Sequence, residues 1–182
     1  MNDDPDLSEA FAVELTVACA DWRRIPDLER VCRTTAAAAI DGADASLGGC
    51  EISLVLADDA SVRVLNRRWR GHDKPTNVLS FPAQARRPAP EAPLLLGDVI
   101  VAYETALAEA QDQRKSLEHH LRHLIVHGVL HLLGHDHEED GPATSMESLE
   151  ARILAGFGVP DPYCAPDRLV ADDIGNGADR RR

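Results

Sequence analysis

The sequence lacks the features that would mark a protein for export or membrane insertion. It opens with acidic residues, MNDDPDLSEA, and no apolar run approaches the roughly 18 residues that cross a bilayer. Its four cysteines, at positions 19, 32, 50 and 164, form no C-x-x-C pair, which argues against a thiolate zinc site and a redox dithiol. We therefore expect a cytoplasmic protein that contacts no membrane, with reduced cysteines that mostly fill the core.

The chain also has little room for a second domain. At roughly 150 residues per domain, 182 residues leave space for one domain and short tails. Hydrophobic residues make up 44% and charged residues 27%, near the globular averages, so a core can form. The formal net charge of −12 would repel a nucleic acid unless the basic residues are concentrated in one place.

Strand patterns come early in the chain and helix patterns come late. Alternation of apolar and polar residues and short β-branched runs predict four strands, at 11–19, 50–57, 77–81 and 94–102. Helical spacing and end signals predict five helices, at 26–40, 58–69, 103–112, 116–133 and 143–157. This order favours an α+β fold, a small mixed sheet of about four strands packed with helices, over a doubly wound fold. We expect this domain at 11–160, an N-terminal tail at 1–10 and an unstructured C-terminal tail at 161–182.

Seven of the eight histidines lie in LEHHLRHLIVHGVLHLLGHDHEED. Their spacing distinguishes candidate metal ligands from the others. His127 and His131 are four residues apart on a predicted helix, so both rings project from one face. A turn at Gly134 can bring His137 back over that face and complete H-x3-H-x5-H, three imidazoles with an open fourth position, as in catalytic zinc sites. His135 is the alternative third ligand, and it requires the helix to continue through Gly134.

The helix that carries these histidines, in the C-terminal half, is almost wholly apolar, so it must be buried. Two rings buried without partners would cost about 1–3 kcal/mol each, whereas one metal ion satisfies both. A single histidine is more often a core residue bonded to a carbonyl group, but three at this spacing favour the ligand interpretation. His119, His120 and His123 lie a turn or more earlier and are expected at the surface or behind the ligands.

Three neutral imidazoles leave the charge of a zinc ion undiluted, so a bound water can ionise near pH 7 and hydrolysis is the default reaction. The spacing does not choose the substrate, because metzincin peptidases share H-x3-H-x2-G-x2-H. Those peptidases use H-E-x-x-H, with the glutamate as general base. Here Gly128 stands at that position, so peptide hydrolysis lacks its usual base.

Positive charge is concentrated in VRVLNRRWRGHDK, between Arg63 and Lys74, which holds five basic residues and one acid. Such a run is usually a solvated helix face. Arg70 differs, because it ends the predicted helix just before a Gly-His-Asp-Lys-Pro turn. There its guanidinium could bind a phosphate through two hydrogen bonds.

LNRRWRGHDKPTNVLSFP and HGVLHLLGHDH together resemble the signatures of the YbeY family of rRNA maturation endoribonucleases, and LGDV at 96–99 is similar as well. The resemblance covers roughly residues 11–158. It implies a single-domain, zinc-dependent and single-strand-specific endoribonuclease that matures the 3′ end of 16S rRNA and acts in ribosome quality control. It also implies a cytoplasmic protein whose partner is the ribosome or a small-subunit precursor.

By position in these motifs, His127, His131 and His137 carry over as catalytic residues and as the ligands of one zinc ion. Arg70 carries over as the catalytic arginine that acts on the RNA phosphate. The family motif usually has tyrosine where His135 stands.

The implied mechanism combines the metal with Arg70. Zinc would activate water or polarise a phosphoryl oxygen while Arg70 neutralises charge on the phosphate. Asp136 and Asp98 are candidates to accept hydrogen bonds from ligand imidazoles, although turn and helix-end positions explain them equally well. No residue stands out as general acid, and either water or the ribose 2′-hydroxyl can be the nucleophile. The alternative functions are a non-catalytic, zinc-containing ribosome-assembly factor and, less favoured, a zinc metallopeptidase.

Overall fold

The computed structural model describes residues 11–43, 47, 49–83, 92–135 and 140–164. The strands are β1 (Phe11–Val17), β2 (Cys50–Ala57), β3 (Val78–Pro82) and β4 (Leu94–Ala102). The helices are the 3₁₀-helix η2 (Ala20–Arg24) and α1 (Leu28–Gly42), α2 (Asp59–Arg70), α3 (Tyr103–Asp112), α4 (Leu117–Leu132) and α5 (Asp140–Ala155). Each predicted strand and α-helix is present with ends that differ by only a few residues, whereas η2 was not predicted.

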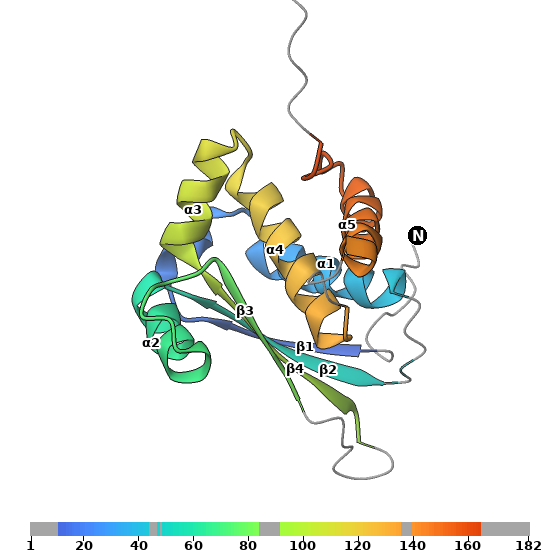
Figure 1. Ribbon diagram of the computed structural model, residues 1–182, viewed down its shortest axis with the longest axis horizontal. Coiled ribbons are helices and arrows are strands. Elements are labelled where there is room, and N and C mark those ends of the chain that lie inside the picture. The colour runs from blue at the N-terminus through green and yellow to red at the C-terminus, as the bar shows by residue number, and fades with distance from the viewer. Residues whose placement is uncertain (1–10, 44–46, 48, 84–91, 136–139, 165–182) are drawn as a thin grey trace, which may run out of the picture.

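The strands form one mixed sheet in the order β1-β2-β4-β3. β1, β2 and β4 run parallel, and β3 pairs antiparallel with β4, so β1 and β3 are the two edges. Figure 1 shows α1, α4 and α5 stacked over one face of this sheet. The predicted α+β fold, a small four-stranded mixed sheet packed with helices, is confirmed.

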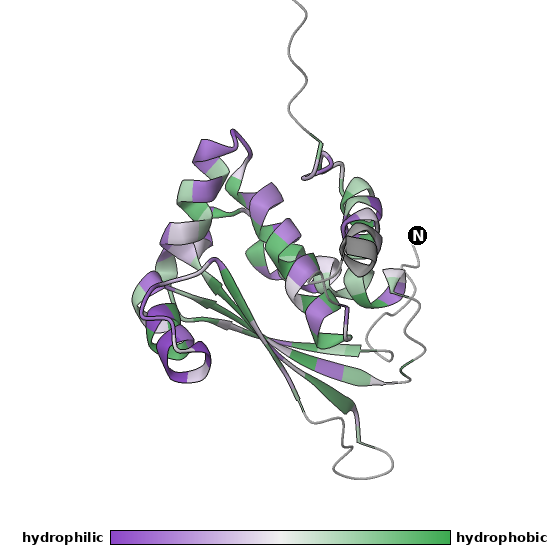
Figure 2. Ribbon diagram, in the orientation of Figure 1, coloured by the Kyte–Doolittle hydropathy of each residue, from purple (hydrophilic) through white to green (hydrophobic). Residues whose placement is uncertain are grey.

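The two faces of the sheet carry cores of different size. Val99 and Val101 of β4 belong to the larger core beneath α1, α4 and α5. Ile100 and Ala102, which alternate with them, belong to a smaller core that Val62 of α2 completes on the opposite face. Figure 2 shows apolar residues through the strands and hydrophilic residues over most of α2. α2 therefore covers little of the sheet and presents most of its surface to solvent.

α4 lies very close to the sheet at Gly128. A Cβ atom at this position would be 2.6 Å from Val99 Cγ1 and 3.2 Å from Ser80 Oγ, closer than side chains ordinarily pack. The Ser80 hydroxyl donates a hydrogen bond to the Gly128 carbonyl oxygen at 3.1 Å. Only glycine fits this contact, which holds the middle of α4 against β3 and β4.

The four cysteines are free thiols, as expected. Cys32 and Cys50 are buried and Cys19 is half-buried, whereas Cys164 is exposed and is the exception to the expectation that the cysteines mostly fill the core. Residues 1–10 and 165–182, most of the two expected tails, lie outside the described residues. Within the described ranges, no helix combines the length and the apolar character that a bilayer span requires.

Candidate metal centre

Two of the predicted ligands lie side by side on α4. The Nε2 atoms of His127 and His131 are 3.1 Å apart, and the two rings are nearly perpendicular, at 81°. Two imidazole nitrogens that each lie 2.0–2.1 Å from one ion at the tetrahedral angle are about 3.3 Å apart. The pair therefore has the spacing of two corners of a tetrahedral metal site.

A buried carboxylate from α5 holds His127 in place. Glu150 is 0% exposed, and its Oε1 accepts a hydrogen bond from His127 Nδ1 at 2.9 Å. Its Oε2 accepts from His123 Nε2 at 3.0 Å and from the Tyr163 hydroxyl. Burial alone would raise the pKa of Glu150, but these three hydrogen bonds outweigh it and lower the pKa to about 2. Glu150 is therefore an ionised acceptor for all three donors.

This hydrogen bond also decides the tautomer of His127. Because Glu150 is ionised, it can only accept, so the proton of His127 sits on Nδ1. Nε2 then keeps the lone pair that faces His131 Nε2. A carboxylate that orients an imidazole in this way is the usual support behind a histidine metal ligand.

Arg70 lines the same pocket as the histidine pair. The pocket has a volume of about 500 Å³, and its wall also includes Ser80 and His135. Arg70 ends α2, and Gly71, in the left-handed region at φ 74°, turns the chain away directly after it. The Arg70 side chain is exposed, and its Nη2 donates to the Ser80 carbonyl oxygen at 3.5 Å. The pocket thus combines two facing imidazoles with a permanent positive charge.

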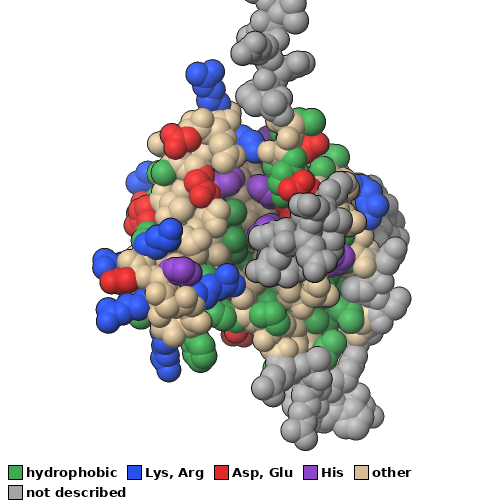
Figure 3. All heavy atoms as spheres, viewed as in Figure 1, with side chains coloured by type: hydrophobic (Ala, Val, Ile, Leu, Met, Phe, Trp, Pro, Cys, Tyr) green, Lys and Arg blue, Asp and Glu red, His purple; other side chains and the backbone are tan. Residues whose placement is uncertain are grey.

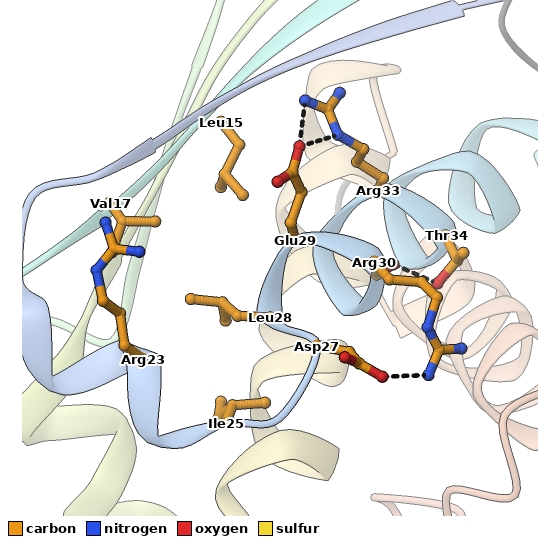
Figure 4. Close-up of a pocket in the computed structure, with 10 residues that line it drawn as sticks. All are labelled: Leu15, Val17, Arg23, Ile25, Asp27, Leu28, Glu29, Arg30, Arg33 and Thr34. Carbon is orange, nitrogen blue, oxygen red and sulfur yellow. Dashed lines mark hydrogen bonds and ion pairs between the residues drawn. The ribbon is translucent and has the colours of Figure 1, made fainter.

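A larger hollow of about 1010 Å³ lies beside β1 and the start of α1 (Figure 4). Of the described residues, no histidine lines it. Figure 4 shows two of its arginines bonded to acids of the same helix region, Arg30 to Asp27 at 3.1 Å and Arg33 to Glu29 at 3.0 Å. These pairs compensate the charges of Arg30 and Arg33, and without an imidazole among its described lining residues this hollow lacks the chemistry of the histidine pocket.

Known proteins are similar to this chain in sequence and in fold. The family model described as Endoribonuclease YbeY matches residues 13–158. The chain belongs to the YbeY family. Relatives named Endoribonuclease YbeY include one from Bradyrhizobium sp., 50% identical over 159 residues, which covers 86% of this chain and 94% of the relative. Another, from Paramagnetospirillum magneticum, is 52% identical over 161 residues and covers 86% and 98%.

A solved structure supports the fold. The solution structure of a Thermotoga maritima protein matches with a TM-score of 0.53 and 20% sequence identity. The match covers 86% of this chain and 99% of that one. At this identity, the likeness establishes the shared fold.

Of the three ligands that the YbeY resemblance implies, His137 lies outside the described residues. Among those that are described, no group of three or more His, Cys, Asp or Glu side chains is placed to hold a metal ion. His135 lines the pocket but does not form such a group with His127 and His131. α4 ends before Gly134, whose φ is 88°, so the helix does not continue as the His135 alternative requires.

Two carboxylates, Asp98 and Asp136, were suggested as hydrogen-bond acceptors for the ligand imidazoles, and only Asp98 is among the described residues. Asp98 is exposed, and it alternates along β4 with Val99, which packs against α4. Its side chain therefore lies on the opposite face of the sheet, and the suggestion that Asp98 supports a ligand was wrong. Asp136 lies outside the described residues.

Sequence reasoning missed Glu150, although the pattern of α5 carries a signal for it. Glu150 stands four residues after Met146 and four before Leu154, both of which are buried. It therefore occupies the apolar face of the helix, where an acid requires partners. Tyr163, which supplies one of them, comes from a segment that the sequence assigned to the tail.

The three earlier histidines of α4 have separate roles. His123 contacts Glu150, which also holds His127, and so lies behind the His127–His131 pair, one of the two positions expected for it. His120 is buried, and its Nε2 lies 2.8 Å from Glu109 Oε2, so the expectation of a surface or supporting position was wrong for His120. Burial lowers the pKa of His120, and this effect outweighs the opposing effect of the nearby Glu109 carboxylate. His119 is half-buried.

Proposed function

We propose that this protein is a metal-dependent endoribonuclease that processes ribosomal RNA, with the pocket between α4, β3 and Arg70 as its active site. The observation that carries the proposal is the approach of His127 Nε2 to His131 Nε2, at 3.1 Å, in a pocket that Arg70 also lines. Membership of the YbeY family, whose relatives are named endoribonucleases, supports this class of reaction.

The proposed cofactor is one zinc ion held by His127, His131 and His137. Imidazole nitrogen is a favoured zinc ligand, and Glu150 keeps His127 in the tautomer whose Nε2 can coordinate. When bound, zinc supplies a water that ionises near neutral pH and a Lewis acid for a phosphoryl oxygen.

Arg70 binds the phosphate in this proposal. Its guanidinium is always charged, and its parallel N–H groups match the spacing of phosphate oxygens. In the described part of the chain, it forms no ion pair, and its contact with the Ser80 carbonyl is long, at 3.5 Å. The guanidinium can therefore turn to a phosphate and neutralise the charge that develops in the transition state.

The packing of α4 argues against a peptidase. A glutamate at position 128 would have to begin 2.6 Å from Val99 Cγ1. The helix could not carry the general base of H-E-x-x-H without moving away from the sheet. Phosphate ester hydrolysis, for which Arg70 supplies the charge, fits the pocket better.

The wider role follows from the family resemblance. We propose residues 11–160 as the catalytic domain, and a single-stranded precursor of the 16S rRNA 3′ end as the substrate. The proposed partner is the ribosome or a small-subunit precursor, in the cytoplasm.

A cleavage assay combined with metal analysis tests the proposal. Zinc-loaded, full-length protein should shorten a 16S rRNA precursor that carries an extended 3′ end. Arg70→Ala should slow cleavage about 10²- to 10³-fold at unchanged zinc content, which is the typical effect of losing one charge-stabilising donor. Arg30→Ala is the matched control, because Arg30 lies on α1 and pairs with Asp27. His131→Ala should lose both zinc and cleavage.

Two results would contradict the proposal. Zinc-loaded wild-type protein that binds the precursor tightly but leaves it uncut would favour a non-catalytic assembly factor. Full cleavage by the Arg70→Ala variant would remove Arg70 from the mechanism.

A further inference from the structure

Trp69, on α2, is a large aromatic side chain left open to solvent. It is 62% exposed, whereas Trp22, the second tryptophan of the chain, is 0% exposed and donates its indole N–H to the Ala57 carbonyl oxygen. Tryptophan is usually largely buried in proteins, and exposed aromatic rings are typical of binding surfaces. The exposure of Trp69 therefore favours a role for this side chain in binding a ligand.

Neighbouring side chains hold the Trp69 ring in position. It meets the Phe81 ring edge to face, with centroids 6.2 Å apart. The Arg68 guanidinium carbon lies 5.2 Å from the Trp69 ring centroid, a cation–π contact. A ring that is fixed in this way loses little conformational entropy when a second planar group stacks on it.

The surroundings of Trp69 are strongly basic. α2 and the turn after it carry Arg63, Arg67, Arg68, Arg70 and Lys74, and only Arg63 forms an ion pair within the described residues, with Asp73 at 2.8 Å. Figure 3 shows blue side chains gathered over the region of α2. In a chain with a net charge of −12, this concentration of positive charge favours a polyanion as the ligand.

Trp69 and the histidine pocket lie on the two sides of the exposed edge strand β3. Ser80 faces α4 and lines the pocket, whereas the next residue, Phe81, faces α2 and contacts Trp69. Arg70 directly follows Trp69 and reaches back to the Ser80 carbonyl oxygen. Arg70, which lines the pocket, is therefore the direct chain neighbour of Trp69 on the other side of β3.

We propose that Trp69 is a stacking site for an unpaired nucleobase that flanks the scissile phosphate. The ligand class is single-stranded RNA, because a base inside a duplex has no free face for the indole. This inference rests on the proposed endoribonuclease function and adds a physical cause for single-strand specificity. Stacking of one base on an aromatic side chain typically strengthens binding about 5- to 150-fold.

Tryptophan fluorescence offers a direct test with the zinc-loaded, full-length protein. A short single-stranded RNA, mixed rapidly so that binding precedes cleavage, should quench the exposed Trp69, while the buried Trp22 contributes a constant background. The same sequence in a duplex should quench weakly. The apolar but non-aromatic variant Trp69→Leu should weaken single-strand binding about 5- to 150-fold and abolish the quenching.

Two further variants separate stacking from a structural role. Trp69→Phe keeps an aromatic face and should retain most of the affinity. Val64→Ala is the matched control, because Val64 is an equally exposed apolar residue of α2, at 64%. Its affinity should equal that of the wild type. Thermal unfolding of each variant shows whether the contact with Phe81 was needed for folding.

The outcomes distinguish this inference from the function on which it rests. If the wild type cleaves RNA and Trp69→Leu binds single strands as tightly as the wild type, the stacking site is refuted and the nuclease proposal stands. Equal loss of affinity in the Phe and Leu variants, or equal quenching by duplex, also refutes stacking. If the wild type neither binds nor cleaves RNA, the proposed function fails, and the stacking site fails with it.

Discussion

The support that Glu150 gives to His127 leads to a quantitative prediction for Glu150→Gln. The carboxylate accepts from His127 with one oxygen and from His123 and Tyr163 with the other. A glutamine amide has a single acceptor oxygen, so its NH₂ group must face one of these sides. If it faces His127, the ring proton moves to Nε2 and blocks the nitrogen that we propose to bind the metal.

The opposite orientation of the amide also carries a cost. Its NH₂ group would then face His123 and Tyr163, and His123 would have to move its proton to Nδ1. That atom is buried and has no hydrogen-bond partner among the described residues. Either way the support is weakened, and loss of such support typically lowers metal affinity 10- to 100-fold, or about 1.4–2.8 kcal/mol.

A zinc titration in competition with a chromophoric chelator measures this loss at constant pH. Glu147→Gln is the matched control, because this change also removes one acidic residue from α5. Among the described contacts, Glu147 forms no hydrogen bond to His127 or His131, so the variant should bind zinc as the wild type does. Nitrogen chemical shifts of the metal-free protein should show the His127 proton on Nδ1 in the wild type. Wild-type zinc affinity in Glu150→Gln, with the His127 tautomer unchanged, would refute the reasoning.

Three further predictions concern packing, pH and thiol chemistry. Gly128→Ala should lower the free energy of unfolding, measured by chemical denaturation, by about 1–2 kcal/mol. The clash with Val99 outweighs the roughly 1 kcal/mol that alanine gains over glycine in helix propensity. Adding Val99→Ala should restore part of the lost unfolding free energy. Burial depresses the folded-state pKa of His120, so its neutral form stabilises the fold above the unfolded pKa of about 6.5. That stability should be lost as the pH falls, by at most about 1.4 kcal/mol per pH unit, and a His120→Gln variant should show a flatter dependence. A thiol reagent at pH 8 should label exposed Cys164 in the native protein, although the hydrogen bond to Asp161 raises its pKa and slows the reaction. Buried Cys32, whose pKa is raised to about 12 by burial, should react only after unfolding.

The elements of the fold followed from local patterns, and the exceptions have clear causes. Residues 94–102 are mostly apolar and partly β-branched, and they follow a proline-rich segment, so β4 was predicted with its observed ends. η2 was missed because its short segment, Ala20–Arg24, has no periodic pattern. Its buried Trp22 packs on Tyr103 at 5.1 Å, a contact more than 80 residues away in the chain that no local pattern indicates.

In the candidate site, too, some features follow from local sequence and others depend on tertiary packing. The facing rings of His127 and His131 follow from a spacing of four on one helix, and this spacing is a local property. Glu150 reaches His127 only because α5 packs against α4, and the predicted Asp98 points away because of its register in the sheet. Both outcomes depend on how separate elements meet.

The sequence by itself determined the family, the α+β class, the helix that bears the histidines and the position of Arg70 at a helix end. Each of these depends on residues that are close together in the chain, where periodicity and end signals act. Only the tertiary structure decided that Glu150 supports the histidine pair, that Gly128 holds α4 against the sheet and that Trp69 stands open beside the edge of β3. These are contacts between elements distant in sequence, and they are set by the packing of three helices on one face of the sheet and of α2 on the other.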